Sequence, residues 1–400
     1  MRLLPVLWLC GPPGVGKTTV GWEIHSRLVD EGVPAGYVDV DQLGICHPDP
    51  AADPGRHALK AANLGAVMTH FRAAGARCVV VSGVVEADHG VRADRLSGVA
   101  LTVCRLRADR RELRERFVGR EAANGASEAG SSGDEAVAAV LRYADELDAS
   151  GFADVCVETG GLSVGEVVGR VRERVGGWPG AAAPEQAGGA YGTATTERPP
   201  ATGAQDTVPP GGTRALWLCG ATGTGKSAVG FPLHLRAARA GFGSAFIDLD
   251  QVGFLSPAPS GDPDHHRTKA RVLADLWRNY RTAGARRLTI VGPATDEATL
   301  RTYTRALAGT PVTVRRLHAG REELTRRILR RGQGLGWAQP GDPLRGRPTA
   351  ELLRVAGQAA AVAGESARAG IGGSHVDTDG ATVAEVADAV AATADWPGRP

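Results

Sequence analysis

The chain has 400 residues, enough for two globular domains that each bury a hydrophobic core. Its 46 basic and 44 acidic residues leave a net charge of +2, and only 5% of residues are aromatic, which argues against nucleic acid and anionic membranes as partners. Six scattered cysteines without a C-x-x-C pair, and no apolar run of membrane-spanning length, predict a reduced, cytoplasmic protein.

The first apolar stretch, Leu3 to Cys10, predicts a buried strand that runs directly into a glycine-rich loop. The loop fits the phosphate-binding pattern G-x-x-x-x-G-K-[ST] and precedes a segment with helical spacing. Its glycines let backbone N–H groups converge on phosphates, Lys17 is expected to reach the β- and γ-phosphates, and the Thr18 hydroxyl is expected to ligate Mg²⁺. A turn without a ligand is the alternative, which the complete motif disfavours. The expected nucleotide-binding residues are Gly11, Gly14, Val15, Gly16, Lys17, Thr18 and Thr19.

Two aspartates, Asp39 and Asp41, follow the second predicted strand, Ala35 to Val40. One residue separates them, so both face the same way on an extended chain, and the carboxyl edge of a parallel sheet would place them beside the phosphate loop. One carboxylate could hold the water shell of Mg²⁺ while the other orients or deprotonates an acceptor hydroxyl. The alternative is that one of the pair caps the next helix. Lys17, Asp39 and Asp41 are therefore the first catalytic candidates.

A histidine and a lysine, His57 and Lys60, lie one helical turn apart on the segment after the aspartates. At that spacing both side chains can converge on one anionic group of an acceptor. A structural salt bridge between the lysine and a nearby aspartate is the alternative, since either use favours a compact ammonium over a guanidinium.

Further apolar runs at Cys78 to Ser82, Leu101 to Leu106 and Asp154 to Val157 alternate with helical segments. The alternation predicts an α/β fold with a five-stranded, mostly parallel sheet between two layers of helices. The third strand ends at Ser82 without the Asp-Glu pair of an oligomeric ATPase motor, and no Asn-Lys-x-Asp guanine reader occurs. These observations argue against motors and GTPase switches.

The same pattern recurs 209 residues later, and even the four lysines of the chain form two pairs at that spacing. The repeat predicts a tandem duplication with domains at 1–178 and 214–400, joined by a flexible linker rich in Pro, Gly, Ala and Thr at 179–213. The second set of nucleotide-binding residues is Gly220, Gly223, Thr224, Gly225, Lys226 and Ser227, with Ser227 as the Mg²⁺ ligand. The second set of catalytic and acceptor candidates is Lys226, Asp248, Asp250, His266 and Lys269.

These motifs resemble the small-molecule and nucleoside-monophosphate kinases among P-loop proteins, such as shikimate, gluconate and adenylylsulfate kinases. The resemblance covers nearly all of both repeats and implies ATP with Mg²⁺ and a small-molecule acceptor. It also implies that arginines on the helix before a mobile lid close over the phosphates, although a solvated helix face is the alternative. The matching residues are Arg116, Arg120, Arg327 and Arg331, with lids at Ala122 to Gly133 and Gly332 to Arg347.

The loops after the third strands differ between the repeats, from Gly83 to Asp88 in the first and from Gly292 to Glu297 in the second. Different acceptor-facing loops favour one catalytic and one regulatory nucleotide site, with the two domains packed as a pseudo-dimer. The function that we predict is an ATP-dependent phosphotransferase acting on a small molecule. A nucleotide-dependent regulatory ATPase or switch, with water as its only acceptor, is the alternative.

Overall fold

The computed structural model describes residues 3–123, 133–180, 212–252, 254–294, 296–336 and 342–398. Most of the predicted linker at 179–213 and parts of both expected lids lie outside these residues. The parts of the chain on either side of the predicted linker are called the first half, residues 1–178, and the second half, residues 214–400. Within the described ranges, no helix is both long enough and apolar enough to cross a membrane.

The first sheet has the strand order β6-β5-β1-β4-β2-β9, and its first five strands run parallel. Strand β1 lies between β5 and β4, so the loop that follows β1 emerges at the middle of the carboxyl edge. The five parallel strands are β1 (Leu4–Cys10), β2 (Ala35–Asp39), β4 (Cys78–Ser82), β5 (Val99–Arg107) and β6 (Val155–Glu158).

Helices cover both faces of this sheet because side chains on its strands alternate between them. Leu7 and Leu9 of β1 belong to one apolar cluster with α1 and α5, whereas Val6 and Trp8 belong to the cluster that contains residues of α2. The helices of the first half are α1 (Lys17–Asp30), α2 (His57–Ala73), α3 (Arg110–Ala123), α4 (Gly133–Ala149) and α5 (Val164–Arg174).

The second sheet repeats this arrangement with the order β12-β11-β7-β10-β8-β3. Its parallel strands are β7 (Arg214–Cys219), β8 (Ser244–Asp248), β10 (Arg287–Val291), β11 (Val312–His318) and β12 (His375–Asp377). The flanking helices are α6 (Lys226–Arg239), α7 (His266–Thr282), α8 (Glu297–Ala306), α9 (Arg321–Gly332), α10 (Thr349–Arg368) and α11 (Val383–Ala394). The predicted α/β class, with mostly parallel sheets flanked by helices, is confirmed.

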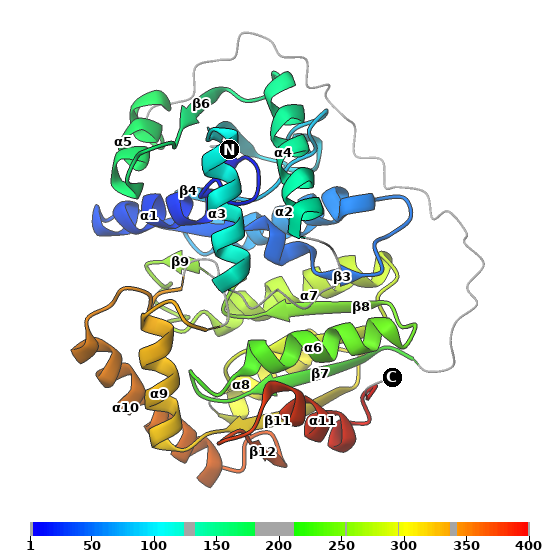
Figure 1. The fold of residues 1–400 in the computed structure, drawn as a ribbon. Helices are drawn as coiled ribbons and strands as arrows, with labels where there is room; N and C mark the ends of the chain where they lie inside the picture. Colours follow the sequence, from blue (N-terminus) through cyan, green and yellow to red (C-terminus); the bar gives the residue numbers. More distant parts are fainter. Residues whose placement is uncertain are drawn as a thin grey trace.

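The predicted number of five strands per sheet is too low, because each sheet receives a sixth strand from the other half. Strand β9 (Phe254–Ser256) of the second half pairs antiparallel with β2, and β3 (Cys46–His47) of the first half pairs antiparallel with β8. Figure 1 shows both short strands between the two halves. Each exchanged strand covers a sheet edge that would otherwise expose unpaired backbone groups.

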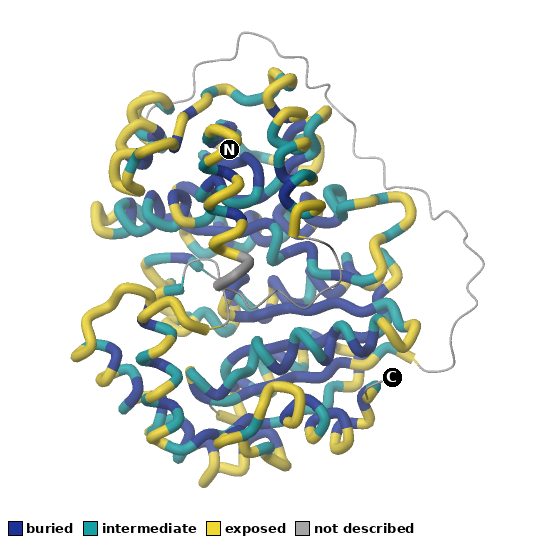
Figure 2. Tube along the Cα trace, in the orientation of Figure 1, coloured by how far each residue is buried: buried dark blue, intermediate teal, exposed yellow. Residues whose placement is uncertain are grey.

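The two halves also share one apolar core, in which helices α2 and α7 contact each other. Leu64 and Phe71 of α2 and Leu273 and Leu276 of α7 all belong to the same buried cluster. Figure 2 shows buried residues along the strands of both sheets. A polar contact joins the same helices, with the Asn279 amide donating to the Asn63 side-chain oxygen at 2.9 Å.

Candidate nucleotide-binding sites

The phosphate loop of the second half lies between β7 and α6 and depends on glycine. Gly220 has φ +146°, and a Cβ there would lie 2.5 Å from the Leu317 carbonyl oxygen, so no other residue fits. Gly223 and Gly225 also adopt left-handed conformations, and Thr224 is buried with its hydroxyl donating to the Ala221 carbonyl. The loop therefore has the tight curl that directs successive N–H groups inward.

Lys226 and Ser227 begin helix α6, directly after this loop. The Lys226 Nζ donates to the Gly220 and Ala221 carbonyl oxygens, both at 3.0 Å, which places the ammonium across the loop. Burial lowers the pKa of Lys226, while the nearby carboxylates of Asp250 and Asp248 raise it. The contact of Lys226 with bound phosphates stays a prediction.

Asp248 stands directly behind the Ser227 hydroxyl. Ser227 Oγ donates to one carboxylate oxygen of Asp248 at 2.6 Å, and the Asp250 N–H donates to the other at 2.9 Å. Burial, with a smaller contribution from the charge of Asp250, raises the pKa of Asp248 to about 6. Asp248 thus contacts the expected metal ligand and also caps the turn that follows β8.

These oxygens fit a hard cation such as Mg²⁺, which commonly binds one or two carboxylates and completes its shell with waters and substrate phosphates. Ser227 and Asp248 would hold it in the second half, and Thr18 and Asp39 in the first. Among the described residues, no group of three or more His, Cys, Asp or Glu side chains forms a separate metal site.

Asp250 pairs with the lysine that the sequence assigns to acceptor binding. The Lys269 Nζ lies 3.6 Å from the Asp250 carboxylate, and the lysine side chain is only 11% exposed. His266 instead contacts the Tyr303 hydroxyl through Nδ1, at 3.1 Å. The geometry is that of the salt bridge named as the alternative, and acceptor binding by these two residues stays a prediction.

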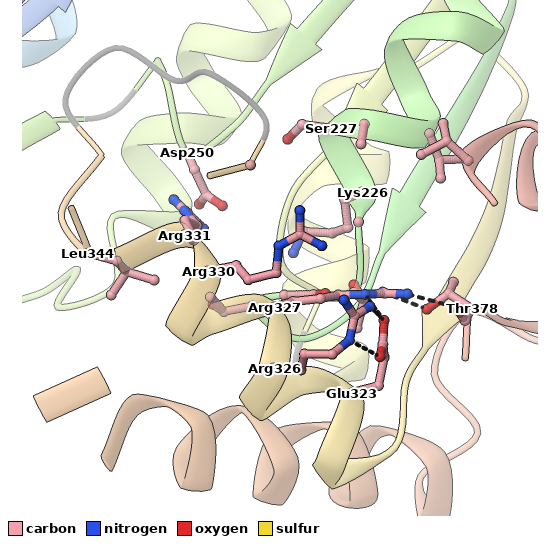
Figure 3. A pocket seen from close by; sticks show the side chains of 18 of the residues that line it. Lys226, Ser227, Asp250, Glu323, Arg326, Arg327, Arg330, Arg331, Leu344 and Thr378 are labelled. Carbon is pink, nitrogen blue, oxygen red and sulfur yellow. Dashed lines mark hydrogen bonds and ion pairs between the residues drawn. The ribbon is translucent and has the colours of Figure 1, made fainter. Parts of the chain in front are cut away.

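Helix α9 brings a row of arginines to the same site, and their contacts differ (Figure 3). Arg327 bonds to Glu323, to the Thr378 hydroxyl and carbonyl, and to the Gly223 carbonyl, which clamps the helix against the phosphate loop. Arg331 donates through Nε to the Asp342 carboxylate at 2.5 Å. The catalytic role predicted for these two arginines is not tested by these contacts.

Arg330 is a site residue that the sequence analysis does not identify. Its guanidinium points into the cavity toward Lys226 (Figure 3), and no described side chain pairs with it. Two cations directed at one region without an intervening carboxylate favour an anion between them. The only sequence signal is its place in the arginine-rich segment, because the equivalent position of the first repeat is not an arginine.

A cavity of about 800 Å³ joins these groups, within the range of about 300–1,000 Å³ that is usual for small-molecule pockets. Its lining extends from Thr378 and Val383 past Lys226 and Ser227 to Asp250 and Lys269. The second phosphate loop therefore opens into a space large enough for a nucleotide and a further group.

The first half reproduces the central contacts around its own loop. Lys17 Nζ donates to the Pro12 carbonyl at 3.2 Å, and Thr18 Oγ1 donates to Asp39 at 2.9 Å. Asp39 also accepts the Asp41 N–H, and burial together with the charge of Asp41 raises the pKa of Asp39 to about 6. Lys60 donates to Asp41 at 2.8 Å, so the salt bridge recurs. The structure brings the predicted loop and aspartate residues together in both halves.

The other predicted residues of the first loop have simpler surroundings. Gly11, Gly14 and Gly16 have positive φ angles, Val15 is buried in the core, and Thr19 is exposed on α1. Their predicted contacts with a nucleotide remain to be tested.

The first half shares one clamped arginine with the second half but differs from it in three respects. Arg116 is clamped to Glu112 and Thr159 as Arg327 is to its partners, and Arg120 lies over the Phe117 ring at 5.1 Å. Gly119, however, stands where the second half has Arg330. The described residues around His57 and Lys60 enclose only about 20 Å³, enough for roughly one water molecule. Val84, Val85 and Val91 line this small cavity.

Comparison with known proteins gives a family match in the first half, where residues 6–146 match a model described as an AAA domain. Strand β4 nevertheless ends at Ser82, without the acidic pair of ATPase motors. A search among curated proteins finds no match.

Solved structures similar to the chain include three small-molecule kinases. A gluconokinase from Sinorhizobium meliloti 1021 is 19% identical over 44% of this chain and 93% of its own, with a TM-score of 0.28. A shikimate kinase from Bacteroides thetaiotaomicron is 16% identical over 43% and 98%, with a TM-score of 0.28. An APS kinase from Mycobacterium tuberculosis, in complex with AMPPNP and APS, is 16% identical over 44% and 99%, with a TM-score of 0.29. The family match over residues 6–146 agrees with the P-loop group that the motifs predict.

Proposed function

We propose that the protein is an ATP-dependent phosphotransferase whose second half transfers the phosphoryl group to a small molecule. The observation that carries this proposal is the cavity beside the second phosphate loop, into which Lys226, Arg330 and Asp250 all face. Cations at one part and a carboxylate at another match the needs of phosphoryl transfer, in which charge on the phosphate is stabilised and an acceptor hydroxyl is oriented.

Each residue would have a distinct task in this reaction. The loop N–H groups and Lys226 hold the phosphates, Arg330 stabilises the charge on the transferring group, and Asp250 orients the acceptor. Bound Mg²⁺, held near Ser227 and Asp248, would neutralise phosphate charge. Lys269 acts through Asp250, because its buried ammonium fixes the position of that carboxylate.

The first half would bind nucleotide without transferring phosphate to a small molecule. Its loop is complete, but it has Gly119 in place of an arginine, and the cavity that His57 and Lys60 line measures only about 20 Å³. The two halves would then be a duplicated pair, packed as a pseudo-dimer, in which one nucleotide site regulates the other.

Phe254 supplies a physical connection between the two sites. The centroid of its ring lies 4.9 Å from the ring centroid of Trp22 in α1 and 5.9 Å from that of Tyr37 in β2. Phe254 also lines the cavity of the second half. Tyr37 in turn donates to the Thr18 carbonyl at the start of α1. A shift of the first phosphate loop would therefore reach the second cavity through the side chains of Tyr37 and Phe254.

A regulatory ATPase with water as the acceptor is the second candidate. The salt bridges of Lys60 and Lys269 favour it, because they leave neither lysine poised for an anionic acceptor.

The test uses matched Lys17→Ala and Lys226→Ala variants of the full chain, with Mg·ATP binding measured by calorimetry and ADP release by a coupled assay. We expect two sites in the unmodified protein and one in each variant, with turnover abolished by Lys226→Ala only. Turnover that depends on Lys17 alone would contradict the proposal, because catalysis would then take place in the first half. ADP release that no metabolite in a mixed library stimulates would support the ATPase.

A further inference from the structure

The part of the second cavity around Asp250 is where an acceptor hydroxyl would meet the γ-phosphate, if the proposed function is right. Apolar side chains line the cavity, among them Phe254, Leu335 and Leu344. Figure 3 places Leu344 on the same side of the cavity as Asp250 and Arg331. The walls therefore suit an apolar or aromatic body rather than a strongly hydrated one.

The lysine in this region offers no surplus charge to an acceptor. Lys269 already lies 3.6 Å from the Asp250 carboxylate and is nearly buried. An acceptor carboxylate or phosphate placed there would compete with Asp250 for the ammonium and would lie close to a like charge.

Charge balance over the whole cavity leads to the same conclusion. Among the residues that the structure describes, six cationic side chains line it: Lys226, Lys269, Arg326, Arg327, Arg330 and Arg331. Asp250 and Glu323 line it as well, and two further carboxylates contact it from behind, Asp248 through Ser227 and Asp342 through Arg331. These six cations and four carboxylates give the cavity a net charge of +2. Mg·ATP carries a charge of about −2, because the metal cancels roughly two of the four phosphate charges. Bound Mg·ATP thus neutralises the cavity and leaves no positive charge for an anionic acceptor.

We infer that the acceptor of the second half is an uncharged alcohol with an apolar or aromatic body. Its hydroxyl lies against Asp250, and its body lies between Phe254 and the leucines. The acceptor oxygen forms a bond to the γ-phosphorus while the bond from that phosphorus to the β,γ-bridging oxygen breaks, and the electron pair of the broken bond stays on ADP. The hydroxyl proton passes to the Asp250 carboxylate, so the products are a phosphate monoester and Mg·ADP.

The test compares two benzylic alcohols of equal size, para-nitrobenzyl alcohol and para-(hydroxymethyl)benzoate, which differ by a neutral nitro group and a carboxylate. ADP release by the full chain is followed in a coupled assay, and the phosphorylated product is identified by mass spectrometry. We expect kcat/KM for the neutral alcohol to exceed that for the carboxylate by about 10-fold or more, the scale at which a site rejects an unpaired charge. Equal use of both, preference for the carboxylate, or no phosphorylation of either would overturn the inference.

A charge variant tests the location. Leu335 is 52% exposed and lines the cavity, so Leu335→Arg should fold normally, add a cation there and shift the preference toward the carboxylate by about 10-fold. Leu353→Arg is the control, because Leu353 is 47% exposed on α10 outside the cavity lining and the preference should not move. An unmoved preference in Leu335→Arg would show that the acceptor binds elsewhere. Calorimetry distinguishes a wrong acceptor site from a wrong proposed function. The proposed function requires that Mg·ATP binds to the unmodified protein and that Lys226→Ala removes this binding site.

Discussion

Arg330 and Gly119 occupy equivalent positions in the two halves, and the difference between them is one guanidinium directed toward a phosphate loop. Arg331 pairs with Asp342, and Arg326 and Arg327 share the Glu323 carboxylate, so each of these guanidinium groups already has a partner in the folded protein. A side chain without such a partner is the one whose interaction energy remains available for a ligand.

Replacing Arg330 by Ala should therefore reduce turnover strongly and nucleotide binding weakly. We expect kcat to fall by about 10²-fold or more, the scale for losing one preorganised group that stabilises transition-state charge, while the affinity for Mg·ATP changes by only a few-fold. The control is Arg326→Ala on the same helix, where the exposed guanidinium pairs with Glu323 and kcat should stay within a few-fold. Equal losses in the two variants would contradict a specific role for Arg330.

The exchanged strands make each half depend on the other for a complete sheet. The register aligns Tyr37 with Phe254 in the first sheet, and the Phe246 N–H donates to the Ile45 carbonyl in the second. Ile45 and Phe254 are equivalent positions 209 residues apart, and each packs among residues of the opposite half. Each of the two short segments that follow the aspartate pairs thus contacts the opposite half in the same way.

Phe254→Ala tests whether this contact carries a signal. Nucleotide at the first loop is expected to change turnover at the second loop by the 5- to 150-fold that is typical of coupled sites. In Phe254→Ala, this fold-change in turnover should fall to about one. The measurement is ADP release by Phe254→Ala with and without the additional Lys17→Ala change, compared with the same pair in the unmodified background. Phe254→Leu, which keeps an apolar side chain, should retain most of the coupling. Undiminished coupling in Phe254→Ala would place the connection elsewhere.

The exchanged strands are also what the sequence analysis does not predict. Local motifs and apolar runs predict the phosphate loops, the aspartate pairs and the parallel strands. Each of these features is encoded within a single short stretch of the sequence. Strand β3 has only two residues and β9 only three, so neither shows a period, and their partners lie in the other half of the chain. Arg330 is missed for a similar reason, since its importance depends on which neighbouring arginines already have carboxylate partners.

A histidine pair fixes one of the exchanged strands and should make its stability depend on pH. His47 Nδ1 lies 2.9 Å from His234 Nε2, and His234 Nδ1 lies 2.8 Å from the Ser244 hydroxyl. Burial lowers the pKa of His234 to about 3, with smaller contributions from the positive charges of His47 and Arg56. Burial also lowers the pKa of His47. The folded state thus requires a neutral His234.

Because the unfolded chain takes up this proton near pH 6.5, the stability that a neutral His234 provides is complete above that pH and falls as the pH decreases toward 3. At pH 5 the loss is about 2 kcal/mol. Urea unfolding at pH 7.5 and pH 5 should show a smaller pH effect in His234→Gln than in the unmodified protein. His89→Gln is the control, because His89 is 68% exposed and its loss should leave the pH effect unchanged. An unchanged pH effect in His234→Gln would argue against this pair as the source.

The apolar core that the two halves share stabilises both of them as one folded unit. The burial of one Leu or Phe side chain contributes about 1.5–3 kcal/mol, so exposing Leu64, Phe71, Leu273 and Leu276 would cost roughly 6–12 kcal/mol. This is comparable with the total stability of an ordinary domain, about 5–15 kcal/mol. A half without its partner would therefore lose most of its stability, in addition to the strand that covers its edge.

We accordingly expect residues 1–178 expressed alone to self-associate or precipitate, because helix α2 and the edge of β2 lack their partners. Co-expression with residues 214–400 on a second chain should instead give a soluble one-to-one complex, since the contacts between the halves do not need a covalent connection. Light scattering after size-exclusion chromatography measures the masses, and ADP release tests whether the complex regains activity. A monomeric first half that unfolds cooperatively, at the denaturant concentration of the full chain, would show that the halves are independent domains. The exchanged strands would then be a contact that the fold tolerates, and coupling through Phe254 would lose its structural basis.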